Sequence, residues 1–349
     1  MSYRARSPLG ARARRRITAA AAAAGAAALA GAALASAGCG SSSMRASAQQ
    51  HLAGTHAAQQ QRDRSRIVAK LEPYRLPAPV SGEAITKRSG ELLVLGGLDS
   101  RDRSTSEIVA LPGALRPRPA GALSEAKHDL AAVQLAGRTL VLGGGSAAEL
   151  DAAEALNAQN SGTRVGTLPS ARSDLSAVTV GAAAYVLGGY DGNEPLADVL
   201  RTTDGSHYAA IGRLAVPFRY AAVTVLGTQI YTFGGELASG EDTSAIQRID
   251  TRTGAVRVIG RLPTPVSHAS AVVLAGRIYV LGGRSRGVAL RRIVAFDPAA
   301  GVARLAGRLP LAVTNAAAIE SGSSGYLIGG IGSGEQALDT VISVQLTAG

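Results

Sequence analysis

The sequence predicts an all-β fold in which six similar four-stranded sheets are arranged radially as a β-propeller, with the last sheet completed by the N-terminal strand. The first observation is a short apolar run that ends in two adjacent glycines and occurs six times. The second is a leucine, usually followed by proline, that lies 20 residues before each glycine doublet. The third is composition: 43 glycines, no tryptophan and 46% hydrophobic residues are typical of a turn-rich β protein.

The glycine doublets recur at a nearly constant spacing. Their first members are Gly96, Gly143, Gly188, Gly234, Gly282 and Gly329, at intervals of 47, 45, 46, 48 and 47 residues. The leucines that precede them, at 76, 123, 168, 214, 262 and 309, show the same five intervals. Two markers that vary together indicate true internal repeats, and a period of this length is typical of propeller blades.

Each repeat contains the elements of one blade in a fixed order. A polar corner follows the leucine, and a strand of small residues comes next, as in 131–135 and 270–274. A short turn leads to the strand that ends in Gly-Gly, as in 277–281. A variable loop then precedes a third strand (293–297), and a glycine turn leads to a fourth (256–259 in the preceding repeat). Radial packing of such sheets protects their edges.

The two ends of the chain suggest how the ring closes. The last repeat ends in a third strand, 340–346, and lacks a fourth. An unassigned strand remains at 66–71, near the start of the repeat region. We therefore expect one propeller domain over 65–349, in which the N-terminal strand completes the last blade.

The first 64 residues have the features of an export signal and a tether. Six arginines and an Ala-rich apolar segment, 17–35, precede Cys39, as in the basic and apolar regions of a secretory signal. Ser36-Ala37-Gly38-Cys39 resembles a bacterial lipobox, which implies cleavage after residue 38 and lipidation of Cys39. An uncleaved anchor, and an ordinary signal peptide with an incidental cysteine, are the alternatives. Residues 39–64 are polar and are expected to form a flexible tether.

Charge and cysteine content exclude several classes of protein. The formal net charge is +11, but removal of the six arginines before Cys39 leaves 30 basic and 25 acidic residues. That remainder has no basic run with interleaved aromatic residues, so no nucleic-acid partner is expected. A single cysteine excludes an intrachain disulfide and a cysteine-based zinc cluster. The expected location is the outer face of the cell membrane. The sequence does not decide between the general secretory and the twin-arginine export pathways.

The repeats resemble those of the kelch family. The likeness rests on the Gly-Gly doublets preceded by Tyr or Leu, on Phe296-Asp297 and Ile249-Asp250, on the Thr253-Gly254 turn, and on Leu-Pro. It covers about 285 residues and implies a six-bladed kelch-type propeller. Kelch repeats usually carry a Trp on the fourth strand, whereas this chain has Tyr208, Val256 or Ala303 there. Thinner contacts between blades are expected in consequence.

The corners that enter the first strand of each blade are the expected binding surface, because they lie on the same face as the loops between second and third strands. The resemblance to peptide-binding kelch proteins, which carry Arg and Ser at these corners, makes Arg172 and Arg219 the leading candidates. A guanidinium can bind a carboxylate or phosphate bidentately, although pairing with Asp174 or Asp129 is the structural alternative. The full set of candidate ligand-binding residues is Lys127, His128, Arg172, Arg219, Tyr220, His268 and Asn315.

The sequence contains no assembled catalytic motif. Copper oxidases on kelch-like propellers need a Cys crosslinked to Tyr, and the mature chain has no cysteine to spare. The histidines of the repeats, at 128, 207 and 268, lack ligand-type spacing, so neither a metal nor a cofactor is expected. We therefore expect a monomeric binding module for a protein, peptide or glycan rather than an enzyme. A sugar-modifying enzyme, such as a mutarotase or sialic acid epimerase on the same fold, is the alternative.

Overall fold

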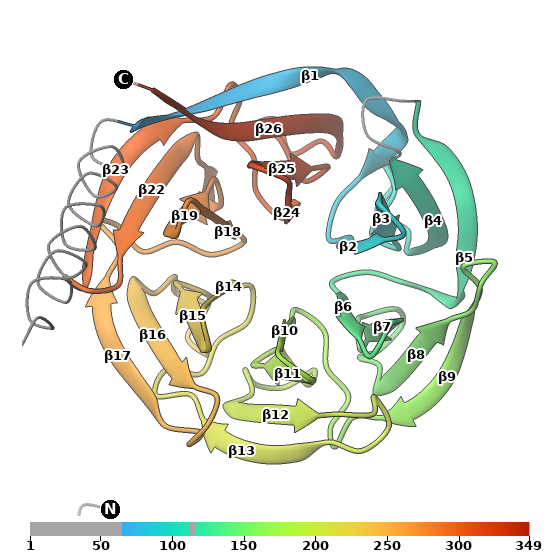
Figure 1. The fold of residues 1–349 in the computed structure, drawn as a ribbon. Helices are drawn as coiled ribbons and strands as arrows, with labels where there is room; N and C mark the ends of the chain where they lie inside the picture. The colour runs from blue at the N-terminus through green and yellow to red at the C-terminus, as the bar shows by residue number, and fades with distance from the viewer. Residues whose placement is uncertain (1–64, 112–115, 349) are drawn as a thin grey trace, which may run out of the picture. The chain divides into compact units, whose positions relative to one another are not determined.

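The computed structural model describes residues 65–111 and 116–348. These residues form six four-stranded antiparallel sheets around a central axis (Figure 1). Within each sheet the four strands lie side by side from the central axis to the outer edge, and each strand is hydrogen-bonded to the next. The expected six-bladed propeller, closed by the N-terminal strand, is confirmed.

Blades 1 to 3 take their strands consecutively from the chain. Blade 1 contains β2 (Ala84–Arg88), β3 (Glu91–Leu95), β4 (Thr105–Leu111) and β5 (Arg118–Lys127). Blade 2 contains β6 (Ala131–Leu135), β7 (Arg138–Leu142), β8 (Ala152–Leu156) and β9 (Gly162–Thr167). Blade 3 contains β10 (Ser176–Val180), β11 (Ala183–Leu187), β12 (Asp198–Thr202) and β13 (Ala209–Arg213).

Blades 4 and 5 follow the same plan, and blade 6 combines the two ends of the propeller. Blade 4 contains β14 (Ala222–Leu226), β15 (Gln229–Phe233), β16 (Ala245–Asp250) and β17 (Val256–Arg261). Blade 5 contains β18 (Ser270–Leu274), β19 (Arg277–Leu281), β22 (Arg292–Asp297) and β23 (Val302–Arg308), with a hairpin of β20 (Arg284–Ser285) and β21 (Val288–Ala289). Blade 6 contains β24 (Ala317–Ser321), β25 (Ser324–Ile328), β26 (Leu338–Ala348) and β1 (Ser65–Val80).

The closing strand β1 pairs with β26 along most of its length. Ser65 lies opposite Ala348, and the pairing continues without a break to Leu71 opposite Ile342. The register then shifts twice, so that Arg75 lies opposite Thr340 and Val80 opposite Leu338. These irregularities absorb the extra residues that make this link longer than the others.

The glycine doublets are the joints between blades. In every blade the N–H of the second glycine donates a hydrogen bond to a carbonyl oxygen in the corner of the next blade, as Gly189 does to Phe218 (3.1 Å). The first glycine has a positive φ, +60° at Gly188, and a Cβ there would lie 2.7 Å from the same carbonyl oxygen. Only glycine combines this conformation with so close an approach. The sixth joint, from Gly330 to Val80 (2.8 Å), connects blade 6 to blade 1.

Small residues line the axis because six innermost strands converge on it. The walls of the central channel carry alanines from each innermost strand, including Ala84, Ala132, Ala177, Ala222 and Ala271. The leucines that precede the doublets are all buried, Leu309 completely. The periodic markers in the sequence therefore correspond to the hydrophobic core and to the blade joints.

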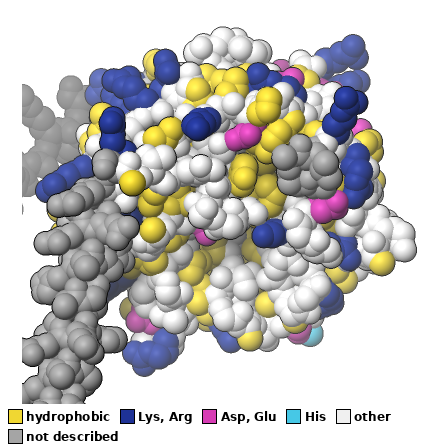
Figure 2. All heavy atoms as spheres, turned by 45° about the horizontal axis from the view of Figure 1, so that its top comes forward, with side chains coloured by type: hydrophobic (Ala, Val, Ile, Leu, Met, Phe, Trp, Pro, Cys, Tyr) yellow, Lys and Arg dark blue, Asp and Glu magenta, His cyan; other side chains and the backbone are white. Residues whose placement is uncertain are grey.

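The surface in Figure 2 carries more Lys and Arg side chains than Asp and Glu, interspersed with apolar ones. In the part of the chain that the structure describes, no helix has the length and apolar character needed to cross a membrane. The expected signal peptide (1–38), lipidated Cys39 and tether (39–64) lie outside the described residues and stay predictions.

Candidate functional site

Each blade begins with a corner of three residues, and each of the three positions has a different structural role. We call them the joint, rim and mouth positions. The joint positions, whose carbonyl oxygens accept the hydrogen bond from the glycine doublet, are Val80, Lys127, Arg172, Phe218, Val266 and Val313. The rim positions, which form a bridge with the residue after the doublet, are Ser81, His128, Ser173, Arg219, Ser267 and Thr314. The mouth positions are Gly82, Asp129, Asp174, Tyr220, His268 and Asn315, which line the central cavity.

A closed ring of backbone hydrogen bonds joins the six mouth positions. Each mouth residue donates its N–H to the carbonyl oxygen of the mouth residue in the preceding blade, from Asp174 to Asp129 (2.9 Å) and onward round to Gly82 and Asn315 (3.1 Å). All six have φ between +49° and +62°. Asn, Asp, His and Gly tolerate this left-handed region best, which accounts for five of the six residues. The N–H and C=O groups of the mouth residues are thus already hydrogen-bonded to one another, so a ligand at the mouth would be bound by side chains.

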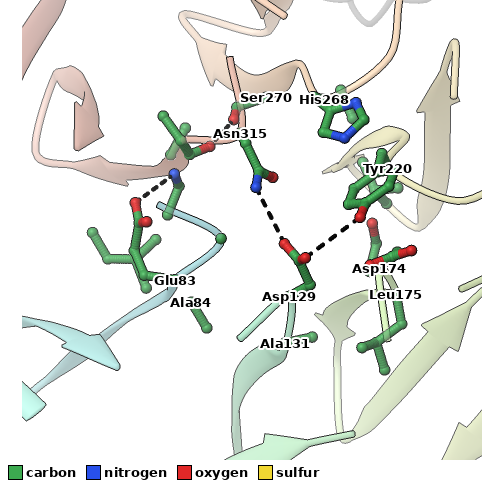
Figure 3. A pocket seen from close by; sticks show the side chains of 18 of the residues that line it. Glu83, Ala84, Asp129, Ala131, Asp174, Leu175, Tyr220, His268, Ser270 and Asn315 are labelled. Carbon is green, nitrogen blue, oxygen red and sulfur yellow. Dashed lines mark hydrogen bonds between the residues drawn. The ribbon is translucent and has the colours of Figure 1, made fainter. Parts of the chain in front are cut away.

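The mouth side chains surround a cavity of about 200 Å³ at one end of the channel. At about 30 Å³ per water molecule it holds roughly seven waters, which suits a small polar molecule or one unit of a larger one. Figure 3 shows Asp129, Asp174 and Tyr220 grouped on one side, with His268 above Tyr220 and Asn315 opposite. Asp129 accepts hydrogen bonds from the Tyr220 hydroxyl (3.4 Å) and from Asn315 Nδ2 (3.3 Å), both long.

Burial makes both mouth carboxyl groups poor acids. Desolvation raises the pKa of Asp129 to about 6. The pKa of Asp174 rises to about 7, first through desolvation and then through repulsion from Asp129. Two neighbouring carboxyl groups of this kind share protons near neutral pH. The mouth therefore presents both a proton donor and an acceptor.

An aromatic pair forms the next part of the wall. The rings of Tyr220 and His268 are stacked, with centroids 3.6 Å apart and planes inclined by 22°. Burial, followed by the nearby Arg284 and Arg219, lowers the pKa of His268 well below its usual value. The imidazole is therefore neutral at neutral pH, and the stacked pair offers an uncharged flat surface.

A third buried carboxyl group, Glu83, follows the mouth position of blade 1 and also lines the cavity. The equivalent residues in other blades are apolar, for example Leu130 and Leu175. Glu83 Oε1 accepts a hydrogen bond from the Ala317 N–H (3.0 Å), whereas Oε2 has no hydrogen-bond partner among the described residues. Desolvation raises the pKa of Glu83 to about 8, so it is mostly protonated at neutral pH.

A side cavity of about 230 Å³ opens beside the mouth and shares Asp129, Asp174 and Tyr220 with it. The loop 145–149 and the side chains of His128, Tyr190 and Arg219 complete it. The Arg219 guanidinium lies 4.6 Å from the centroid of the Tyr190 ring, as in a cation–π contact. The two cavities together make up the candidate site, with the central cavity lined by all six blades and the side cavity by blades 2 to 4.

An ion-pair network holds Arg219 at the rim. Glu236 accepts hydrogen bonds from Arg219 through Oε1 and from Arg284 through Oε2 (2.7 Å). Asp174 lies 3.6 Å from Arg219 on the other side. The side chain of Arg219 is 28% exposed, so it both stabilises the rim and faces the side cavity.

Two of the residues expected to bind ligand are buried at joint positions instead. Arg172 is fully buried and forms a bidentate ion pair with Asp198, both bonds at 3.0 Å. Lys127 is fully buried and pairs with the equally buried Glu154. Other blades place a buried Val or Phe at the joint. Arg172 and Lys127 therefore stabilise the blade joints in this structure and do not line either cavity.

The structure brings the other five expected residues together around the two cavities: Tyr220, His268 and Asn315 at the mouth, and His128 and Arg219 at the rim. The set of ligand-binding residues expected from the sequence left out Asp129, Asp174, Glu83 and Tyr190, although Tyr190 was considered there as a residue that could stack on a sugar. One available signal was spacing, because every mouth residue lies 14 positions before the first glycine of the next doublet, and every joint residue lies 16 before it. Aligning the corners on the doublets separates Arg172 from Arg219, which occupy different positions.

The described residues contain no group of three or more His, Cys, Asp or Glu side chains arranged to hold a metal ion. The chemistry of the candidate site is thus that of carboxyl groups, an amide, two phenols, two imidazoles and one guanidinium.

Comparison with known proteins places this architecture. Residues 265–302, which cover the entering corner and the first three strands of the blade 5 sheet, match the family described as Kelch motif. No curated protein matches the chain. Among solved structures, that of YjhT is similar, with 15% sequence identity and a TM-score of 0.69 over 78% of this chain and 98% of that chain.

The chain is thus a six-bladed β-propeller that carries a kelch motif in blade 5. At 15% identity, the likeness to YjhT concerns the fold alone.

Proposed function

We propose that the protein is an exported binding module whose channel mouth holds one unit of a carbohydrate. The observation that carries this proposal is the group of Asp129, Asp174, Tyr220, His268 and Asn315 around one small cavity. Sugar hydroxyls both donate and accept hydrogen bonds, so they complement carboxyl, amide and phenol groups. The flat Tyr220–His268 pair provides an apolar surface for a sugar ring.

A peptide is a poorer match for the mouth. Peptides that bind by strand addition need free backbone N–H and C=O groups on the protein. The ring at the mouth positions uses these groups for hydrogen bonds between blades. The cavity of about 200 Å³ would also admit little more than one side chain.

Charge narrows the class of sugar. The two cavities are lined by four acidic side chains, Glu83, Asp129, Glu149 and Asp174, and by one arginine, Arg219. Arg219 is already paired with Glu236 and Asp174. Neutral sugars and amino sugars should therefore bind better than acidic sugars, whose carboxylates would meet the mouth carboxyl groups.

Binding of the full chain to a glycan and peptide array, followed by calorimetry with the best ligand, tests this proposal. Asp174→Asn and Asp129→Asn should each weaken binding about tenfold or more, because a hydrogen bond to a charged group is worth about 1.5–3 kcal/mol. The matched control is Asp297→Asn, which removes an exposed carboxylate at the end of β22 on blade 5. Unchanged affinity in both mouth variants, or selective binding of peptides, would refute the carbohydrate site.

One observation favours a second function, the sugar-modifying enzyme. With pKa values of about 6 and about 7, Asp129 and Asp174 can serve as base and acid at neutral pH. Such a pair suits proton transfers at the ring oxygen and anomeric hydroxyl of a sugar. Faster interconversion of anomers in the presence of the chain, measured by NMR and lost in Asp174→Asn, would establish catalysis; an unchanged rate would leave binding alone.

We also propose that the propeller is tethered to the outer face of the cell membrane. Support comes from the basic and apolar leader, the lipobox-like segment that ends at Cys39, and the polar residues 39–64. The expected product begins at a lipid-modified Cys39. Mass spectrometry of the mature chain tests this, and Cys39→Ala should move the protein from the detergent phase to the aqueous phase. A Cys39→Ala protein that still partitions into detergent would exclude the lipid anchor.

A further inference from the structure

The outer surface of the propeller is asymmetric in a way that neither the fold nor the carbohydrate site requires. Among the described residues, five large hydrophobic side chains are exposed, and four of them lie on three outermost strands: Leu71 on β1, Val258 on β17, and Val302 and Leu305 on β23. Leu305 is 56% exposed. The outermost strands β5, β9 and β13 carry none.

These three strands are consecutive around the circumference. Figure 1 shows β17, β23 and β1 following one another at the outer edge of blades 4, 5 and 6. The strands also contact each other directly, β17 with β23 and β23 with β1. Ile67 of β1 lies against Gly307 of β23, where a Cβ would be 3.0 Å from the isoleucine. We call the exposed surface of β17, β23 and β1 the outer wall.

The outer wall is also strongly basic. Seven exposed cationic side chains lie on it, against a single acid, Glu72; they are Arg66, Lys70, Arg75, Arg257, Arg261, Arg304 and Arg308. None of the seven forms an ion pair with a described residue. On the other outermost strands, Arg118 pairs with Glu91 and Arg164 with Asp151, and Arg213 on β13 is the one exposed arginine without an ion pair to a described residue. The free positive charge is thus concentrated where the exposed apolar side chains are.

The N-terminal tether begins at this same surface. β1 starts at Ser65, and 25 residues separate it from Cys39. A propeller held by a lipid at Cys39 would have this wall among the surfaces nearest to the point of attachment. Apolar side chains among unpaired cations are the combination that binds the interface of an anionic bilayer.

We propose that the outer wall docks the propeller against an anionic lipid surface, an inference that rests on the proposed lipid anchor. Docking places the outer edge of blades 4 to 6 on the membrane, so the propeller axis lies roughly parallel to the bilayer. The channel mouth then opens sideways, accessible to glycans in the surrounding envelope. Each wall arginine near the surface contributes about fivefold to the association, so the loss of three weakens it about 100-fold.

The absence of tryptophan from the chain allows a sharp test. Leu305→Trp introduces a sole tryptophan on the wall, and Ala209→Trp introduces one on the exposed outer strand β13 of blade 3; excitation at the red edge of the absorption band selects tryptophan over the nine tyrosines. Full chains are reconstituted in vesicles of phosphatidylglycerol and phosphatidylcholine with brominated acyl chains, and flotation first measures anchoring. We expect strong quenching of the tryptophan at position 305 and little at position 209, with the difference lost in pure phosphatidylcholine or in high salt.

Matched arginine variants identify the charges responsible. Arg257→Gln, Arg304→Gln and Arg308→Gln together should reduce quenching at position 305 to the level at position 209. Arg101→Gln, Arg201→Gln and Arg213→Gln remove three exposed arginines from blades 1 and 3 and should leave it unchanged. Equal quenching at both positions, or none at either in chains that float, overturns the proposal.

The anchor and the wall can fail separately. If the chains do not float, the lipid anchor is wrong, and the two tryptophan chains carrying Cys39→Ala are mixed with phosphatidylglycerol vesicles at low salt. Selective quenching at position 305 then still supports the wall, and its absence overturns it. Carbohydrate binding in solution is measured without vesicles and is independent of both.

Discussion

The glycine joints between blades lead to a prediction that can be made with an internal control. Gly188 directly follows β11 and Gly181 lies in the turn before it, and the two have nearly the same φ, +60° and +59°. A Cβ at Gly181 would meet nothing within 4 Å, whereas a Cβ at Gly188 would lie 2.7 Å from both the carbonyl oxygen and the ring of the buried Phe218. The two alanine substitutions therefore share the conformational penalty and differ in the joint.

The expected free energies follow from these contacts. An alanine at positive φ costs about 1–2 kcal/mol at either position. Gly188→Ala also displaces the Phe218 carbonyl, which loses the hydrogen bond from Gly189, worth about 1 kcal/mol. Overpacking against the Phe218 ring adds about 1–3 kcal/mol. Gly188→Ala should thus lose about 3 kcal/mol more than Gly181→Ala, or about 6–12 °C in Tm.

Thermal and urea denaturation of the two full-length variants, followed by circular dichroism, measures the difference. The reasoning is refuted if Gly188→Ala and Gly181→Ala lose the same stability. In that case the doublets would be needed only for their backbone conformation, and the blade joint would contribute nothing.

Other predictions concern buried charges and ring closure. Lys127→Met leaves Glu154 buried without its cation and should reduce the unfolding free energy by about 3–5 kcal/mol. The double variant Lys127→Met, Glu154→Leu should recover most of the lost stability. A double variant as unstable as Lys127→Met alone would contradict the prediction. The raised pKa of Glu83, about 8, means that the native state holds a proton that the unfolded chain releases near pH 4. The contribution of Glu83 to stability should decline as pH rises from about 4 to about 8. Glu83→Gln should therefore flatten the dependence of Tm on pH. An identical dependence in the variant would exclude a raised pKa at Glu83. Deletion of residues 65–72 removes the strand paired with β26 and should abolish soluble monomeric folding, whereas an unchanged melting curve would disprove closure by this strand.

The sequence predicted the fold because the periodic residues perform the same structural task in every blade. Gly-Gly is needed wherever a carbonyl oxygen of the next blade approaches the chain, and the preceding leucine is buried in every repeat. Closure of the ring was predictable because the last repeat, which ends at residue 346, lacks a fourth strand, and a strand that begins at residue 66 belongs to no repeat. The register shifts beyond Leu71 were not, since they depend on how the extra residues of the link bulge.

The candidate site was less predictable, because of two neighbouring corner residues one is buried between blades and the next faces a cavity. Arg172 and Arg219 look equivalent as arginines at corners, yet one occupies a joint and the other a rim position. Burial of Lys127 and Arg172 also depends on partners in distant strands, Glu154 and Asp198, that no local pattern identifies. The raised pKa values of the mouth carboxyl groups likewise arise only when different blades meet at the axis.

The ring of backbone hydrogen bonds at the mouth has a consequence for how such a protein can change. Each mouth residue is held by its main chain and contributes only a side chain to the cavity. The six positions therefore share a fixed main-chain frame and are limited mainly to residues that accept a positive φ. Their side chains are coupled where they meet, as Asp129 is with Tyr220 and Asn315. Gly, Asp, Asp, Tyr, His and Asn form one combination out of many. Exchanging them offers a direct route to propellers with new ligand preferences, without redesign of the fold.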